Sequence, residues 1–424
     1  MSFQEIRVLF DTGATKVPVG ILAVADRRML FEYEASWVSG GLELAPFHLP
    51  VTKRSFTFEQ SRLPCGLPGL FADSLPDGWG TLIMDRYFQR QGVARNDITL
   101  IDRLAYLGDD AMGALCYEPS LKSEKILQEA VRIGVAAREA LQLYEGKITD
   151  AGRLLAKIGG SPGGARPKAL IGIPAEGDGF VSGNGPLPEG YTHWMVKFSG
   201  EGRGGANDYG KYEGTLEYVC LQMAKAAGIT VPEFRLIDDG TKVRHLAVRR
   251  FDRPSSTSRR HVATACGLLH ADYRLPSRDY AELLRVAWAL TRDSNQVQEQ
   301  FRRAMFNLLS GNRDDHAKNH GYLMDESGRW RLSPVYDVTF SSGPGGEHWT
   351  SYLGEGSRPG ATTLLQLAEQ ASIKANQART IIEQVQSAMM LFPSLAKELG
   401  VPIKLRRTVA ERLLQTQSEV IGRK

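Results

Sequence analysis

The sequence predicts an α+β fold in which a strand-rich N-terminal part precedes a mostly helical C-terminal part. Two observations carry this prediction. Within the first ~120 residues, apolar positions alternate in short segments bounded by turn residues, which is typical of β-strands. From about Tyr280 onward, the apolar spacing is mostly that of amphipathic helices.

In the N-terminal part, short strands are expected at residues 6–10, 19–23 and 29–34. The segment LFADSLPDGWG then leads from a turn into a helix, which either Ser74 or Asp77 could cap. The segment LGDDAMGALCYEP, residues 107–119, is typical of a loop that enters a strand. We take residues 1–120 as a β-rich N-terminal subdomain.

The middle part, residues 121–255, is predicted to hold two linking helices and a small lobe. The helices are expected at 123–146 and 150–159, and a glycine-rich loop then enters a strand. In YTHWMVKFSG, Trp194, Val196 and Phe198 share one strand face, and Met195 and Lys197 share the other. A helix at 215–229 ends near Gly228, and strands follow at 231–238 and 244–253. Residues 256–424 are expected to form a helical lobe.

The composition is that of an ordinary globular protein. The chain has 424 residues, of which 42% are hydrophobic and 24% are charged, and this length allows two or three domains and a large core. The net charge of +4 suits an anionic ligand but is lower than that of most dedicated nucleic-acid binders. Composition therefore gives no indication of DNA binding.

The cysteines and the N-terminus indicate a cytoplasmic protein with no membrane contact. The four cysteines are far apart and form no CxxC pair, which argues against a metal site or a disulfide scaffold. The N-terminal MSFQEIRVLFDTG is typical of a first strand and not of a signal peptide. No apolar run approaches the length of a membrane span.

The segment GNRDDHAKNHGYLM carries the most specific chemistry. Asp314 lies five positions before Asn319, and Asp337 follows in LSPVYDVTF after an apolar run. Phosphoryl transfer needs one carboxylate to orient the attacking hydroxyl, and an amide and a second carboxylate to hold Mg²⁺ against the phosphates of ATP. Asp315 is the rival acid, but it lies only four positions from Asn319, so the kinase spacing favours Asp314. A polar turn would account for any one of these residues alone.

Two features upstream are compatible with a nucleotide site. The glycine-rich loop around Ser161 could close backbone N–H groups on an anion, but taken alone a flexible turn between a helix and a strand explains it better. Lys197 lies on an otherwise apolar strand, where it is either a surface lysine or a phosphate-binding lysine. Glu213 and Glu217 in the next helix could each pair with it. The segment VRRFDR falls where an adenine hinge would lie, and a strand end with surface charges is an equal alternative.

Together these motifs resemble the HipA family of serine/threonine-kinase toxins of type II toxin–antitoxin modules. The likeness covers nearly the whole chain, and its order and spacing fit. The segments that carry it are LFADSLPDGWG, LGDDAMGAL, GGSPGGARPKALI, THWMVKF, LEYVCLQMAKAAGI, AVRRFDR, NRDDHAKNHGYL and LSPVYDV. The resemblance implies a two-lobed, protein-kinase-like fold of the phosphoinositide-kinase-like branch, with an added N-terminal subdomain.

The resemblance also implies a role for each matching residue. Asp314 is the expected catalytic base, Asn319 and Asp337 are the expected Mg²⁺ ligands, and Lys197 is the expected phosphate-binding lysine. The loop over ATP is expected to comprise Gly163, Gly164, Ala165, Arg166, Pro167 and Lys168. The adenine hinge is expected at Arg249, Arg250 and Phe251, and further nucleotide contacts are expected at His316, Ala317, Lys318, Asn319 and Tyr336.

Regulation and partners follow from the same resemblance. Family members autophosphorylate a serine at the position of Ser161, and the modified loop leaves the ATP site, because the added charge of roughly −1.5 to −2 is repelled there. Pro162 and the Arg166–Pro167 pair depart locally from the family pattern. The implied substrate is an aminoacyl-tRNA synthetase, such as glutamyl-tRNA synthetase. The implied partner is a HipB-like helix-turn-helix antitoxin, which would carry the complex to operator DNA.

Two alternatives stay open at this point. The chain could be a kinase for a small molecule or a lipid, although the sizeable N-terminal subdomain favours a protein partner. It could also be a catalytically silent corepressor, although the joint presence of Lys197, Asp314, Asn319 and Asp337 argues against that.

Overall fold

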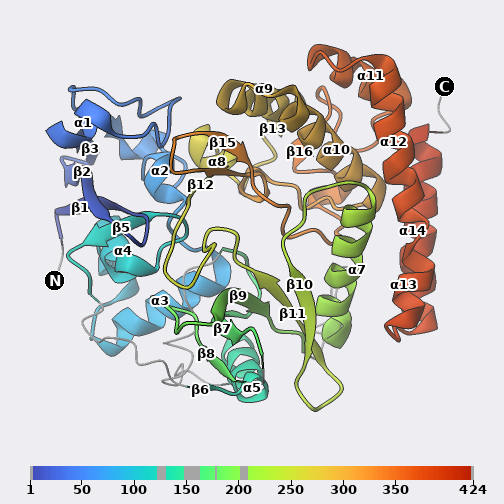
Figure 1. The fold of residues 1–424 in the computed structure, drawn as a ribbon, viewed down its shortest axis with the longest axis horizontal. Helices are drawn as coiled ribbons and strands as arrows, with labels where there is room; N and C mark the ends of the chain where they lie inside the picture. The colour runs from blue at the N-terminus through green and yellow to red at the C-terminus, as the bar shows by residue number, and fades with distance from the viewer. Residues whose placement is uncertain (1–2, 122–129, 148–162, 177–178, 201–208, 422–424) are drawn as a thin grey trace.

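The N-terminal part of the chain is built on an antiparallel sheet with strand order β4-β3-β2-β1-β5. The structure, a computed structural model shown in Figure 1, describes residues 3–121, 130–147, 163–176, 179–200 and 209–421. The strands of this sheet are β1 (Glu5–Asp11), β2 (Lys16–Ala25), β3 (Arg28–Tyr33), β4 (Phe56–Glu59) and β5 (Leu115–Glu118). The three strands predicted first are confirmed. Alternate apolar residues of β1 and β3 enter one core, and Val19 and Leu22 of β2 join them across a register shift between β1 and β2.

Short helices cover this sheet. They are α1 (Ala35–Gly40), α2 (Gly69–Ala72) and α4 (Leu100–Leu107). Helix α4 begins with a capping box, in which the Thr99 hydroxyl accepts from the Asp102 amide and the Asp102 carboxylate accepts from the Thr99 amide. The apolar faces of α2 and α4 contribute Phe71, Ile101 and Leu104 to the core of the sheet.

Helix α3 (Gly78–Arg90) belongs to two cores at once. Met84 and Phe88 pack with the N-terminal sheet, whereas Trp79 and Ile83 pack with the second sheet. Each pair is spaced by four residues and so lies on one helix face. Asp77 stands at the predicted cap position, but its side chain makes no cap hydrogen bond.

The second sheet has the strand order β10-β11-β9-β7-β8-β6. Its strands are β6 (Ala130–Val131), β7 (Lys168–Pro174), β8 (Phe180–Ser182), β9 (Tyr191–Lys197), β10 (Phe234–Asp238) and β11 (Arg244–Arg249), and the neighbouring helices are α5 (Ile133–Tyr144) and α7 (Glu213–Ala226). Strand β9 alternates as predicted, with Trp194 and Val196 buried and Met195 and Lys197 half-buried. Helix α7 ends as predicted, since Gly228 follows it with a φ of +79°.

One predicted helix is wrong at its start. The segment 123–146 was expected to be a single helix, but residues 130–131 pair with β8 as strand β6, and α5 begins only at Ile133. Pairing with a distant strand decides this local structure, and helical spacing cannot indicate it. The helix predicted at 150–159 and Ser161 lie outside the described residues.

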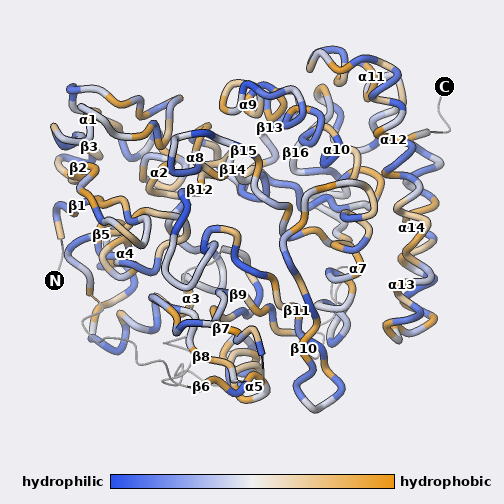
Figure 2. Tube along the Cα trace, viewed as in Figure 1, coloured by the Kyte–Doolittle hydropathy of each residue, from blue (hydrophilic) through white to orange (hydrophobic). Residues whose placement is uncertain are grey.

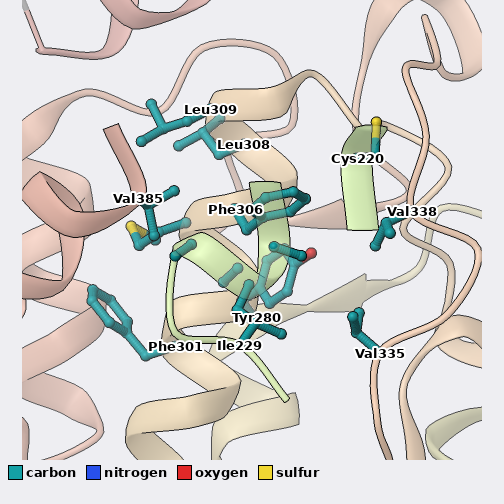
Figure 3. Close-up of a cluster of buried hydrophobic side chains, with 14 of the residues drawn as sticks. Cys220, Ile229, Tyr280, Phe301, Phe306, Leu308, Leu309, Val335, Val338 and Val385 are labelled. Atoms are coloured by element: carbon teal, nitrogen blue, oxygen red, sulfur yellow. The ribbon is translucent and has the colours of Figure 1, made fainter. Parts of the chain in front are cut away.

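The C-terminal part is mostly helical, as predicted. Its helices are α8 (Ala265–Leu268), α9 (Tyr280–Thr291), α10 (Ser294–Ser310), α11 (Ala361–Gln370), α12 (Ala375–Met389), α13 (Phe392–Glu398) and α14 (Ile403–Ile421), and its strands are β12 (His261–Thr264), β13 (Arg278–Asp279), β14 (Gly321–Met324), β15 (Trp330–Leu332) and β16 (Thr350–Ser351). Tyr280, Phe301, Phe306 and Val385 lie in its core, which Figure 3 shows. Hydrophobic and hydrophilic residues are interspersed along α14 (Figure 2), as expected for a helix with one buried face.

Buried arginines tie the N-terminal part to the rest of the chain. Arg253 and Arg259 both donate to the carbonyl oxygen of Gly113, at 2.8 and 3.1 Å. The Gly113 amide in turn donates to the Asp252 carboxylate at 2.9 Å. The segments LGDDAMGAL and AVRRFDR therefore form one buried polar junction. The predicted division of the chain near residues 120 and 255 stays a prediction.

Among the described residues, no helix combines the length and the apolar character that a membrane crossing requires.

Candidate active site

A cavity of about 380 Å³ lies where the N-terminal part, the second sheet and the helical lobe meet. Its walls contain most of the residues that the sequence predicted for a nucleotide site. These residues are Gly163, Gly164, Ala165, Arg249, Arg250, Phe251, Asp314, His316, Lys318, Asn319, Tyr336 and Asp337. Segments about 150 to 170 residues apart in the sequence thus meet in one place, since Asp314 and Asp337 line the same cavity as the Gly163–Ala165 loop.

The loop after α10 carries the first acid. Helix α10 ends at Gly311, which has a φ of +68° and turns the chain towards the cavity. The Asp314 side chain is 51% exposed and lies 3.9 Å from the imidazole of His316. The Asn319 side-chain amide donates to the Asp314 carbonyl oxygen at 2.7 Å, which fixes the loop. Burial raises the pKa of the Asp314 carboxyl, and His316 partly opposes this effect.

The rival acid, Asp315, points in the opposite direction. It is fully buried and accepts hydrogen bonds from the Tyr280 hydroxyl at 2.7 Å and from His348 Nδ1 at 2.9 Å. The backbone amide of Trp349 donates to it as well. Its carboxylate therefore supports the helical lobe and does not line the cavity, so Asp314 stays the candidate base.

The second acid and the strand lysine are in direct contact. Lys197 Nζ donates to Asp337 and, at 2.5 Å, to Glu217 on α7. Of the two glutamates left open by the sequence, Glu217 is thus the partner of Lys197, while Glu213 pairs with Arg166 at 2.9 Å. Burial alone would raise the pKa of Asp337, but the ammonium groups of Lys197 and Lys168 lower it to about 2.

The glycine-rich loop is folded back on its own lysine. Lys168 is buried, and its Nζ donates to the carbonyl oxygen of Gly163. Burial lowers the pKa of Lys168, while the charge of Asp337 opposes that effect. Four other predicted residues, Arg166, Pro167, Lys168 and Lys197, are not among those that line the cavity. The Pro167 carbonyl oxygen accepts from the Phe198 amide at 3.0 Å, next to the strand of Lys197.

The predicted hinge lines the cavity, but part of its backbone is already bonded. The amides of Arg249 and Arg250 donate to the carbonyl oxygens of Glu233 and His193, at 2.8 and 2.9 Å. The Phe251 and Tyr336 rings lie 5.8 Å apart at the wall and offer apolar surface to a planar base. The Tyr336 hydroxyl donates to the Lys318 carbonyl oxygen at 2.6 Å, and this bond links the two segments.

The loop that carries Asp314 faces the N-terminal part through Lys318. Its Nζ lies 3.6 Å from Asp77 and 4.7 Å from the centre of the Tyr273 ring. Burial would lower the pKa of Lys318, but Asp77 and Asp73 raise it above its usual value. The predicted contact Ala317 is not part of the wall, since it packs in the core of the helical lobe.

Sequence reasoning missed a wall of the cavity that comes from the N-terminal part. Asp73, Leu75, Asp77 and Met112 line it. Asp73 accepts two hydrogen bonds from Thr264, and its burial raises the pKa of this carboxyl to about 6. The sequence feature that could have indicated this wall is the pair of segments LFADSLPDGWG and LGDDAMGAL. These segments contain all four residues.

A glycine-rich loop, a strand lysine paired with a helix glutamate, and two acids around one cavity define the class of protein-kinase-like phosphotransferases. Family models then identify the chain more closely. The HipA-like C-terminal domain matches residues 160–391, and the HipA N-terminal domain matches residues 11–118. The chain therefore belongs to the HipA family of kinases.

Curated relatives are similar over most of the chain. The serine/threonine-protein kinase toxin HipA of Shewanella oneidensis is 25% identical over 72% of this chain and 68% of its own length. The putative kinase Y4dM of Sinorhizobium fredii is 26% identical over 64% of this chain and 62% of its own length.

A solved structure confirms the fold. In the complex of HipA, HipB and operator DNA from Shewanella oneidensis MR-1, a chain with 18% identity matches 98% of this chain, with 97% of its own length covered and a TM-score of 0.69. The predicted α+β kinase-like fold with an N-terminal addition is thus confirmed.

Proposed function

We propose that this chain is a serine/threonine-protein kinase toxin that uses ATP and Mg²⁺. The observation that carries the proposal is the convergence of Asp314, Asn319 and Asp337 on one cavity, with Lys197 bonded to Asp337. A kinase needs these groups together, since its catalysis consists of positioning and of charge stabilisation.

The donor atoms fit a magnesium ion. Asn319 and Asp337 both line the cavity and offer oxygen ligands, which Mg²⁺ prefers. The amide nitrogen of Asn319 is engaged by the Asp314 carbonyl oxygen, so its amide oxygen is the ligand atom to expect. When bound, the ion would neutralise charge on the phosphates.

Asp314 would act on the substrate hydroxyl. In the proposed step, the hydroxyl oxygen forms a bond to the γ-phosphorus, and the bond from that phosphorus to the leaving ADP oxygen breaks. The hydroxyl proton passes to the Asp314 carboxylate, whose raised pKa suits it to accept a proton. When ATP binds, the Lys197 ammonium group would weaken its hydrogen bond to Asp337 and donate to the phosphates as well.

The proposed biological role follows the named relatives. One of them is a kinase toxin, and a structural neighbour was solved with HipB and operator DNA. We accordingly propose a HipB-like helix-turn-helix antitoxin as partner, with operator DNA bound through it, and a cytoplasmic location. An aminoacyl-tRNA synthetase, such as glutamyl-tRNA synthetase, is the proposed substrate, and autophosphorylation of Ser161 is the proposed off switch.

Transfer of labelled phosphate from ATP tests the enzymatic part. The full-length wild type, Asp314→Asn, Asp337→Asn and Lys197→Met are each incubated with Mg–ATP and a cell lysate. We expect labelled proteins only with the wild type, and label on Ser161 of the kinase itself. Full activity of Asp314→Asn would disprove the assignment. Label in lipids or small molecules alone would favour a non-protein substrate, and no ATP binding at all would favour a silent corepressor.

A further inference from the structure

We propose that the start of α3 is a clamp that holds the glycine-rich loop over the nucleotide cavity, with Asp77 as its positioning residue. The inference rests on the proposed function in so far as the loop covers a nucleotide. It gives the N-terminal part a direct role in the kinase site, because the clamp lies in LPDGWG and its target lies almost ninety residues later, at Gly164.

The first contact of the clamp is made by the Asp77 side chain. Asp77 occupies the cap position of α3, yet its carboxylate leaves its own helix and accepts a hydrogen bond from the Gly164 amide. A carboxylate with helix amides within reach normally caps them. That Asp77 bonds to the loop instead identifies the loop as its functional target.

Trp79 provides two more contacts that do not depend on Asp77. Its backbone amide donates to the Gly164 carbonyl oxygen at 3.2 Å, and its indole nitrogen donates to the Lys168 carbonyl oxygen at 2.8 Å. The ring itself is fully buried in the core of the second sheet. Trp79 therefore donates hydrogen bonds to both ends of the segment from Gly164 to Lys168, and its own position is fixed because it belongs to α3.

The close fit at Gly78 adds a steric constraint. A Cβ atom at this position would lie 2.5 Å from the Cα atom of Ala165, and the residue has a φ of +22°. Only glycine lets the helix start approach the loop this closely. The sequence DGW thus combines an acceptor, a close backbone approach and two donors in three consecutive residues.

Asp77 also connects the loop to the opposite wall. Its second carboxylate oxygen lies 3.6 Å from Lys318 Nζ, and both side chains are mostly buried, at 13% and 15% exposure. Lys318 belongs to the same short segment as Asp314 and Asn319. One carboxylate at the cavity wall therefore contacts both the phosphate loop and the catalytic loop, and fixes their separation.

Amide hydrogen exchange on the nucleotide-free, full-length protein tests the clamp directly. In Asp77→Ala, we expect peptides covering residues 163–168 to exchange roughly tenfold faster or more, because a charge-assisted hydrogen bond is lost. Asp77→Asn keeps an acceptor for Gly164 but loses the charge opposite Lys318, so its exchange should be intermediate. Trp79→Phe keeps the ring in the core and removes one donor, and should accelerate the same peptides.

Asp293→Ala is the matched control. Asp293 is a partly buried aspartate at a helix cap position, as Asp77 is, but its side chain accepts from the Asn295 amide of its own helix. Its loss should accelerate exchange in α10 and leave residues 163–168 unchanged. This control separates a lost clamp from a general loss of stability.

Calorimetric titration with Mg–ATP gives the functional readout. It is done in the Asp314→Asn background, where no phosphate transfer is expected, and Asp77→Ala should bind roughly tenfold more weakly there. Unchanged loop exchange, unchanged affinity or tighter binding would each overturn the inference, and tighter binding would mean that Asp77 competes with the phosphates. If the parent protein binds no ATP, the proposed function fails, and loop exchange still decides whether the clamp exists.

Discussion

Asp314 and Asp315 are adjacent in the chain but lie in opposite environments. The Asp314 side chain is 51% exposed at the cavity, whereas Asp315 is fully buried and receives hydrogen bonds from Tyr280 and His348. In the proposed mechanism, this loop thus uses Asp314 for the chemistry and Asp315 to support the loop. A buried carboxylate with several donors rigidifies the loop that carries its neighbour.

Asparagine substitutions at these two positions should therefore have different effects. Asp314→Asn should lower phosphate transfer by on the order of 10²–10⁴-fold and leave the free energy of unfolding nearly unchanged, because this side chain is half-exposed. Asp315→Asn should lower the free energy of unfolding by about 3–5 kcal/mol. The variant loses a buried charge that its donors stabilise, and its NH2 group would take the place of a carboxylate oxygen opposite those donors. Kinase assays and urea denaturation of both variants measure this. Equal stability losses in the two variants would contradict the division of roles.

The sequence predicted the local structure around the candidate site, for a physical reason. The spacing of Asp314 and Asn319, the alternation around Lys197 and the glycine after α7 are all short-range patterns, and the structure retains them. Strand β6 and the Asp77 wall were missed because both depend on partners far away in the chain. Residues 130–131 pair with β8, and Asp77 meets Gly164, and no local period indicates either contact.

The buried polar junction between the N-terminal part and the kinase lobes can be tested with two arginines of the segment AVRRFDR. Arg253 is buried and donates to the Gly113 and Ala111 carbonyl oxygens and to Asp252, at 2.8, 3.0 and 2.8 Å. Arg253→Ala should lower the free energy of unfolding by about 1–3 kcal/mol, because it removes buried hydrogen bonds, one of them to a charged group, while Arg250 and Arg259 still donate to the same acceptors. Urea denaturation, followed by far-UV circular dichroism, measures the loss.

Arg249 is the matched control for Arg253. It pairs with Glu233 at 2.9 Å, but both side chains are exposed, at 37% and 59%. Arg249→Ala should therefore change the free energy of unfolding by about 0–1 kcal/mol. Comparable losses in Arg253→Ala and Arg249→Ala would show that the junction does not hold the two parts together.

Acid should destabilise the protein through its buried imidazoles, and His261 is the simplest case. Its Nε2 donates to the Leu44 carbonyl oxygen at 3.2 Å, and its ring lies 6.0 Å from Phe10 and 5.5 Å from Trp330. Burial lowers the pKa of His261 from 6.5 to about 4. Between pH 6.5 and pH 4, His261 is protonated in the unfolded chain but stays neutral in the folded protein. Protonation therefore favours the unfolded chain, so the free energy of unfolding is unaffected by His261 above pH 6.5 and falls as the pH is lowered towards 4.

His261→Gln should remove this pH dependence, while its amide can still donate to Leu44. Between pH 7 and pH 4, the free energy of unfolding of the wild type should fall by about 3 kcal/mol more than that of the variant, since one pH unit is worth about 1.4 kcal/mol for one proton. Other buried histidines contribute equally to both proteins, so the difference between the two curves isolates His261. Trp330→Phe is the control, because it weakens packing against the ring without removing a titrating group, and its curve should run parallel to that of the wild type. Parallel curves for His261→Gln and the wild type would mean that His261 does not couple folding to pH.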